Sequence, residues 1–109
     1  LSIINYTVAP VFMKINSKGK HEWLIEFEIP PMNIKNFSRF LDEKLKELNS
    51  DYEAKRHKNI TLKSPLVTIA KKNLFYDWLS KKNKLGGQNK IPRLSNTREY
   101  IDALLRLNI

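Results

Sequence analysis

The stretch from residue 84 to residue 93 contains the residue types that are best suited to chemistry. Gly86 and Gly87 let the backbone bend, and a proline near the end fixes the direction in which the stretch leaves. Lys90 and Arg93 are cations of the kind that bind phosphate or carboxylate oxygens. Such a loop could deliver a lysine to an active site built by another domain. The alternative is a surface turn with two solvated cations, which spacing alone favours.

Tyr52 and Arg56 form a second candidate pair, because residues four apart share one face of a helix. They could support one another or reach a ligand. The alternative, an exposed helical pair, is again favoured by spacing alone. We interpret His21 as a half-buried structural residue and His57 as part of a solvated basic face, so neither is a candidate for catalysis.

Several classes of site are excluded by the composition. The chain has no cysteine, so it has neither a disulfide framework nor a thiolate metal site, and two histidines make a poor metal set. It contains no phosphate-binding loop motif and no dinucleotide-binding fingerprint, so it could not hold ATP unaided. No apolar run approaches the roughly 20 residues that a membrane span requires. We therefore expect a soluble, cytoplasmic protein without a membrane partner.

The charge is high and unevenly distributed. The formal net charge is +9, which favours polyanionic partners such as nucleic acid, a nucleotide or an acidic protein surface. Residues 44–90 hold 12 Lys/Arg against 4 Asp/Glu, a net charge of +8. A stand-alone module that binds nucleic acid through this middle segment is therefore one hypothesis for the function.

Two extended runs, residues 3–15 and 21–29, are joined by turn-forming residues and predict a β-hairpin. The second run alternates strictly, so one of its faces should be buried and the other, which carries three glutamates, should be mostly wet. Residues 66–70 form a short, β-branched apolar run that predicts a buried strand. The side chains expected on the buried face of the second run are His21, Trp23, Ile25, Phe27 and Ile29.

A long amphipathic helix is predicted after the two prolines at positions 30 and 31, with Asn33 as its N-cap. A second, short helix should be capped by Asn49 or Ser50 and should be polar and exposed. The apolar stripe of the long helix should lie on the hairpin sheet. It consists of Ile34, Phe37, Leu41, Leu45 and Leu48.

Two further amphipathic helices complete the pattern. The first covers residues 74–79 and must end near Leu85, because the glycine pair that follows is a poor helix interior. The second has Asn96 as its predicted N-cap, with Glu99 at the capping-box spacing. We interpret the aromatic residues at these periods as core and not as a platform for stacking bases or sugars. They are Trp23, Phe27, Phe37, Phe40, Phe75 and Trp78.

The order of these elements predicts an α+β fold, a single compact domain over residues 1–109 with helices packed on a small mixed or antiparallel sheet. The chain starts at once with strand-like residues and without methionine. We interpret this start as a cut end.

Three stretches resemble the C-terminal domain of the auxin-responsive, or Gretchen Hagen three, acyl-acid amido synthetase family. They are residues 21–28 (HEWLIEFE), 48–56 (LNSDYEAKR) and 86–93 (GGQNKIPR). The resemblance covers nearly the whole chain in matching order and is closest to the bacterial branch. The second and third strings are distinctive together, whereas the first alone is weak.

The resemblance implies a ligase that works in two steps and requires ATP and Mg²⁺. A carboxylic acid and ATP give an acyl-adenylate and pyrophosphate, and an amine, usually of an amino acid, then displaces AMP to form an amide. The family's large N-terminal adenylation domain binds the nucleotide and the acid, and the small C-terminal domain rotates over that site as a lid. On this interpretation the present chain is the lid, is inactive alone, and does not bind nucleic acid specifically.

The resemblance also implies a role for Lys90, whose counterpart in the family reaches the nucleotide site. A fixed ammonium there would stabilise the negative charge that develops as pyrophosphate leaves, which makes Lys90 the catalytic candidate. Tyr52 and Arg56 match a Tyr-x-x-x-Arg pattern of the family but have no assigned step. The remaining candidates are Arg93 and Gln88 for nucleotide binding or loop positioning, and Gly86 and Gly87 for the loop hinge.

Overall fold

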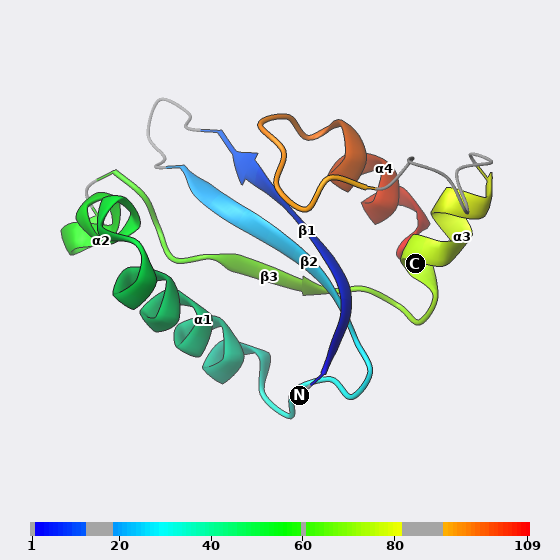
Figure 1. The fold of residues 1–109 in the computed structure, drawn as a ribbon, viewed down its shortest axis with the longest axis horizontal. Coiled ribbons are helices and arrows are strands. Elements are labelled where there is room, and N and C mark those ends of the chain that lie inside the picture. The colour runs from blue at the N-terminus through cyan, green and yellow to red at the C-terminus, as the bar shows by residue number, and fades with distance from the viewer. Residues whose placement is uncertain (1, 13–18, 60, 82–90) are drawn as a thin grey trace.

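The computed structural model describes residues 2–12, 19–59, 61–81 and 91–109 of the chain (Figure 1). Within these residues, three strands form one mixed sheet in the order β1 (Ile3–Val11), β2 (Lys20–Phe27) and β3 (Leu66–Ile69). β1 and β2 pair antiparallel as the predicted hairpin, whereas β2 and β3 pair in parallel. The predicted α+β fold is confirmed. Most of the predicted turn between the first two strands lies outside the described residues.

Helices account for most of the remaining described chain. They are α1 (Ile34–Leu48), α2 (Ser50–Arg56), α3 (Leu74–Lys81) and α4 (Glu99–Leu107), with a short 3₁₀ turn, η1 (His57–Asn59), after α2. Asn33 caps α1 by accepting the Asn36 backbone N–H at 3.1 Å, as predicted. Asn49 caps α2 in the same way, accepting the Tyr52 N–H at 3.0 Å. The predicted end of the third helix near Leu85 lies outside the described residues.

The predicted start of the last helix is wrong. α4 begins at Glu99, and the residue at its N-cap position is Arg98, which makes no side-chain capping bond. The residues before it are held elsewhere, because the Ser95 N–H donates to the Val8 carbonyl at 3.0 Å. Asn96 therefore lies too early in the chain to cap the helix.

The helices cover both faces of the sheet: α1 and α2 lie on one side of it, and α3 and α4 lie on the other (Figure 1). A hydrophobic core cluster lies on the α3–α4 side, where Leu24 of β2 packs with side chains of the two helices. Leu24, Leu74 and Leu104 are completely buried there. Members of this cluster on the helices are Leu74, Phe75, Trp78, Ile101 and Leu104.

Because helices cover both faces of the sheet, the prediction of a mostly solvent-exposed face on β2 is wrong. Leu24 is on the face that was expected to be mostly wet, and so are Glu22 and Glu26, which are only 6% and 3% exposed. Glu22 accepts hydrogen bonds from Arg98 at 2.7 Å and from the Thr68 hydroxyl at 3.1 Å. Glu26 accepts the Asn73 backbone N–H at 2.9 Å. Both carboxylates can be buried because the elements packed on this face supply donors.

The opposite face of β2 is covered by α1 and α2, but less completely. Phe27 meets Phe37 of α1 edge-on, with ring centroids 5.2 Å apart, and is buried. Ile29 lies beyond the end of the strand and is exposed, as is Phe40, so the core assignment of Phe40 is wrong. Leu48, at the last position of α1, is also exposed, because the C-terminal end of the helix extends past the stripe residues that pack on the sheet.

The third strand was predicted correctly in position but not in burial. Leu66 and Ile69 remain 39% and 40% exposed. The reason is topological, because β3 pairs only with β2 and forms an edge of the described sheet. Within the part of the chain described here, no helix combines the length and apolar character needed to cross a membrane.

Candidate functional site

Residues 91–95 are fastened along β1. The Val8 N–H donates to the Arg93 carbonyl at 2.8 Å, and the Thr7 hydroxyl donates to the Pro92 carbonyl at 2.7 Å. Ile91 is inserted into the core and is 7% exposed. We call residues 84–93 the basic loop, and its C-terminal end is therefore attached to the sheet. Gly86, Gly87, Gln88 and Lys90, the other loop candidates, lie outside the described residues.

The Arg93 side chain lies over an aromatic ring of the sheet. Its guanidinium carbon is 4.9 Å from the centre of the Tyr6 ring, a cation–π contact. Arg93 itself is exposed, and among the described residues no carboxylate forms an ion pair with it. This cation is therefore oriented by the sheet and remains free to pair with an anion.

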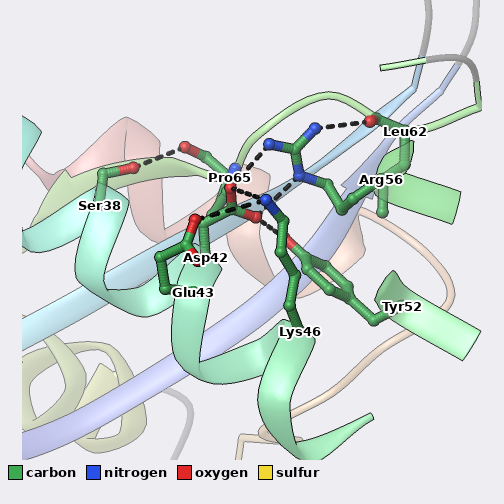
Figure 2. A network of polar contacts seen from close by, with 8 residues as sticks. All are labelled: Ser38, Asp42, Glu43, Lys46, Tyr52, Arg56, Leu62 and Pro65. Carbon is green, nitrogen blue, oxygen red and sulfur yellow. Dashed lines mark hydrogen bonds and ion pairs between the residues drawn. The ribbon is translucent and has the colours of Figure 1, made fainter. Parts of the chain in front are cut away.

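Tyr52 and Arg56 meet at a buried carboxylate. Both side chains converge from α2 on Asp42 of α1 (Figure 2). The Tyr52 hydroxyl donates to Asp42 Oδ1 at 2.6 Å, and Arg56 donates from Nε to Oδ1 at 2.8 Å and from Nη2 to Oδ2 at 2.7 Å. Arg56 Nη1 also donates to the Leu62 carbonyl at 3.1 Å. Lys46 Nζ is 3.6 Å from Asp42 Oδ2.

The prediction of an exposed helical pair is therefore wrong. Tyr52 is 8% exposed and Arg56 is 9% exposed. The four-residue spacing does put the two side chains on one face of α2, but that face packs against α1 and the segment around Leu62. A buried guanidinium requires a partner, and the bidentate contact with Asp42 provides it.

The ionisation of the cluster follows from these contacts. The hydrogen bonds from Arg56, followed by the one from Tyr52, lower the pKa of Asp42 from 3.8 to about 2, although burial opposes the change. Burial and the hydrogen bond to Asp42 raise the pKa of Tyr52. The hydrogen bond to Asp42 raises the pKa of Arg56. At neutral pH the cluster is thus a carboxylate bound by a phenol and a guanidinium, which suits positioning better than proton transfer.

The Tyr52 ring has a second role, because it also lines a hollow on the α1–α2 face of the sheet. Arg93, in the segment of residues 91–95 that runs along β1, lines the same hollow, and so do Tyr6 and Trp23. The structure therefore brings together two candidates, Tyr52 and Arg93, that are 41 positions apart in the sequence. It does not bring Arg56 into this group, since Arg56 does not line the hollow.

A comparison with protein-family models matches residues 1–99 to the model described as the GH3 family C-terminal domain. The chain belongs to the GH3 family. It corresponds to the C-terminal domain of that family, as the resemblance in the sequence implied. A search of curated proteins found no match to the chain.

Sequence reasoning missed several polar residues of this GH3 domain. Asp42 is next to Leu41, at the edge of the apolar stripe of α1. A carboxylate at this position, followed in the sequence by a helix with the Tyr-x-x-x-Arg pattern, was the signal that could have indicated their contact. Glu22 and Arg98 are 76 positions apart, and no local pattern links them. Among the residues that the structure describes, no group of three or more His, Asp or Glu side chains is arranged to hold a metal ion.

Proposed function

We propose that this GH3 domain is the mobile lid of an ATP-dependent acyl-acid amido synthetase. In the reaction, a carboxylate oxygen attacks the α-phosphorus of ATP, and the bond to pyrophosphate breaks to leave an acyl-adenylate. An amine, usually of an amino acid, then attacks the acyl carbon, loses a proton and expels AMP as the amide forms. The N-terminal adenylation domain of the full-length enzyme would bind ATP, Mg²⁺ and the acid.

The observation that carries the proposal is the attachment of residues 91–95 to β1. A loop that delivers a cation to another domain needs at least one rigid end, because the cation must arrive at a defined place. The hydrogen bonds from Thr7 and Val8, with Ile91 buried in the core, supply that rigid end immediately after Lys90. This supports a role for the basic loop in positioning charge over a partner's active site.

In this proposal Lys90 stabilises the departing pyrophosphate. Negative charge accumulates on the bridging oxygen as the bond to the α-phosphorus breaks, and a fixed ammonium interacts with it more strongly in the transition state than in the ground state. Arg93 would hold the end of the loop through its contact with Tyr6. Gln88 would contribute to nucleotide binding or loop positioning, and Gly86 and Gly87 would let the loop bend.

The buried cluster of Asp42, Tyr52 and Arg56 would have a supporting role. It joins α2 to α1 through buried, charge-assisted hydrogen bonds, so the two helices would move together. A lid that rotates as a unit over an active site requires such rigidity, and its closure excludes water from the adenylate. Tyr52 and Arg56 are thus positioning residues in this proposal.

The experiment that tests the proposal is ATP–pyrophosphate exchange across a panel of carboxylic acids, run on the full-length protein and on the 109-residue chain. We expect acid-dependent exchange with the full-length protein and none with the chain alone. Absence of exchange with every acid, in a full-length protein shown to be folded, would overturn the proposal. The acid that supports exchange would also identify the acyl substrate.

A further inference from the structure

The hollow lined by Tyr52 and Arg93 has the volume and the walls of a small ligand site. Its volume is about 290 Å³, just below the range of roughly 300–1,000 Å³ that is typical of ligand pockets. It lies between the face of β1 and β2 that carries Tyr6 and Trp23 and the first two helices, with Asn49 at the junction of those helices. A ligand of one or two rings would fill it.

Four aromatic rings give the hollow flat walls. Tyr6 and Trp23 are stacked, with centroids 5.8 Å apart and planes 25° from parallel. His21 and Tyr52 form a second stacked pair, with centroids 6.3 Å apart and an interplanar angle of 29°. The bond to Asp42 fixes the position of the Tyr52 ring. Flat, fixed aromatic walls favour a planar ligand, because ring stacking adds to the burial of apolar area.

Among the described residues that line the hollow, Arg93 is the one that carries a charge at neutral pH, and this charge is positive. Arg93 lines it and has no carboxylate partner among the described residues. His21 does not add to this charge at neutral pH, since burial and, to a lesser extent, Lys55 lower its pKa below the ordinary 6.5. Lys55 and Asp51 line the neighbouring hollow and pair with each other at 3.1 Å. Of the described residues, a ligand would therefore meet the Arg93 guanidinium as the one cation without a carboxylate partner.

The Trp23 ring is one of the walls of the hollow. An aromatic ligand stacked on this wall would shift the magnetic resonance signal of the Trp23 indole N–H through its ring current. The Trp23 indole therefore reports whether a ligand has entered the hollow.

We propose that this hollow binds a small planar aromatic anion, with its ring against Tyr6 and Trp23 and its anionic group paired with Arg93. The site differs from the nucleotide contact proposed for Lys90, because it is formed by the sheet, α1, α2 and residues 93–94 and requires no nucleotide. A bound anion would pair with Arg93, at the attached end of the basic loop, so ligand binding would act directly on that end of the loop.

The test uses the ¹⁵N-labelled 109-residue chain and two probes of the same shape, 2-naphthoate and its neutral analogue 2-naphthamide. The chain has two tryptophans, so it gives two indole N–H signals, and Trp23→Phe assigns them. Trp78 lies in the core on the other face of the sheet and serves as an internal control. We expect 2-naphthoate to shift the Trp23 signal and leave the Trp78 signal in place.

Charge recognition is tested with Arg93→Gln and with Arg106→Gln, a matched change of an exposed arginine on α4. Loss of one charge-assisted contact should weaken 2-naphthoate binding about tenfold or more in the first variant and leave the second unchanged. Binding of 2-naphthamide should be weaker than that of 2-naphthoate and insensitive to either change. An unmoved Trp23 signal, equal affinity for the two probes, or equal effects of the two variants would overturn the proposal.

Discussion

Replacement of Asp42 by Asn should destabilise the domain more than any exposed charge change does. The substitution preserves the shape of the side chain but removes the charge that Arg56 binds at 2.7 Å. The two side chains are only 7% and 8% exposed, so water cannot replace the lost partner. Removal of one partner of a buried ion pair costs about 3–5 kcal/mol. Because asparagine retains one acceptor oxygen, we expect a loss of about 2–4 kcal/mol.

The assay is urea unfolding at pH 7, followed by tryptophan fluorescence and circular dichroism. Asp51→Asn is the matched control, because Asp51 pairs with Lys55 at 3.1 Å while both side chains are more than half exposed. An exposed pair of this kind contributes about 1 kcal/mol or less. Equal losses in Asp42→Asn and Asp51→Asn, or a loss below about 0.5 kcal/mol for Asp42→Asn, would refute the reasoning.

The same substitution predicts a pH dependence. Folding lowers the pKa of Asp42 from 3.8 to about 2, chiefly through the hydrogen bonds from Arg56. A carboxyl group with a lowered folded-state pKa stabilises the protein fully above its unfolded pKa, and this stabilisation disappears as the pH falls through the folded pKa. The difference between the two values corresponds to about 2 kcal/mol. The stability gap between wild type and Asp42→Asn should therefore narrow by this amount from pH 5 to pH 2, whereas a constant gap would contradict the assignment.

Four further substitutions test the fold with the same unfolding assay. Tyr52→Phe removes a buried hydrogen bond to a carboxylate and should cost about 1.5–3 kcal/mol; no loss would mean that the bond does not form. Glu22→Gln weakens the contact with Arg98 and should cost about 1–3 kcal/mol, which an unchanged urea midpoint would rule out. Leu104→Ala should cost about 2–5 kcal/mol, because Leu104 is fully buried, whereas Phe40→Ser should cost less than about 1 kcal/mol; a reversed order would contradict the core described here.

Features determined by neighbouring residues could be predicted from the sequence. Asn33 and Asn49 cap their helices because a capping side chain acts on a backbone N–H two or three residues away. The hairpin, the third strand and the α+β class follow in the same way from alternation and turn residues. The family could also be recognised, because its distinctive strings are contiguous in the sequence.

Features determined by distant residues could not be predicted. Alternation in β2 correctly separated Glu22 and Leu24 from Trp23, but it could not show that helices would cover both faces and bury Glu22 against Arg98. The exposure of Tyr52 was predicted wrongly for the same reason, since its partner Asp42 lies on another helix. A polar residue in a periodic pattern can be solvated or buried with a partner, and only the tertiary contacts distinguish the two cases.

The most direct test of the central claim is the rate of adenylate formation in the full-length protein carrying Lys90→Ala, compared with Lys84→Ala, a lysine of the same loop. The two substitutions remove the same charge six positions apart. If Lys90 stabilises the departing pyrophosphate, Lys90→Ala should slow ATP–pyrophosphate exchange about 10²-fold or more while Lys84→Ala leaves it nearly unchanged. An unchanged rate in a folded Lys90→Ala protein, or equal slowing by both substitutions, would contradict the role proposed for this loop.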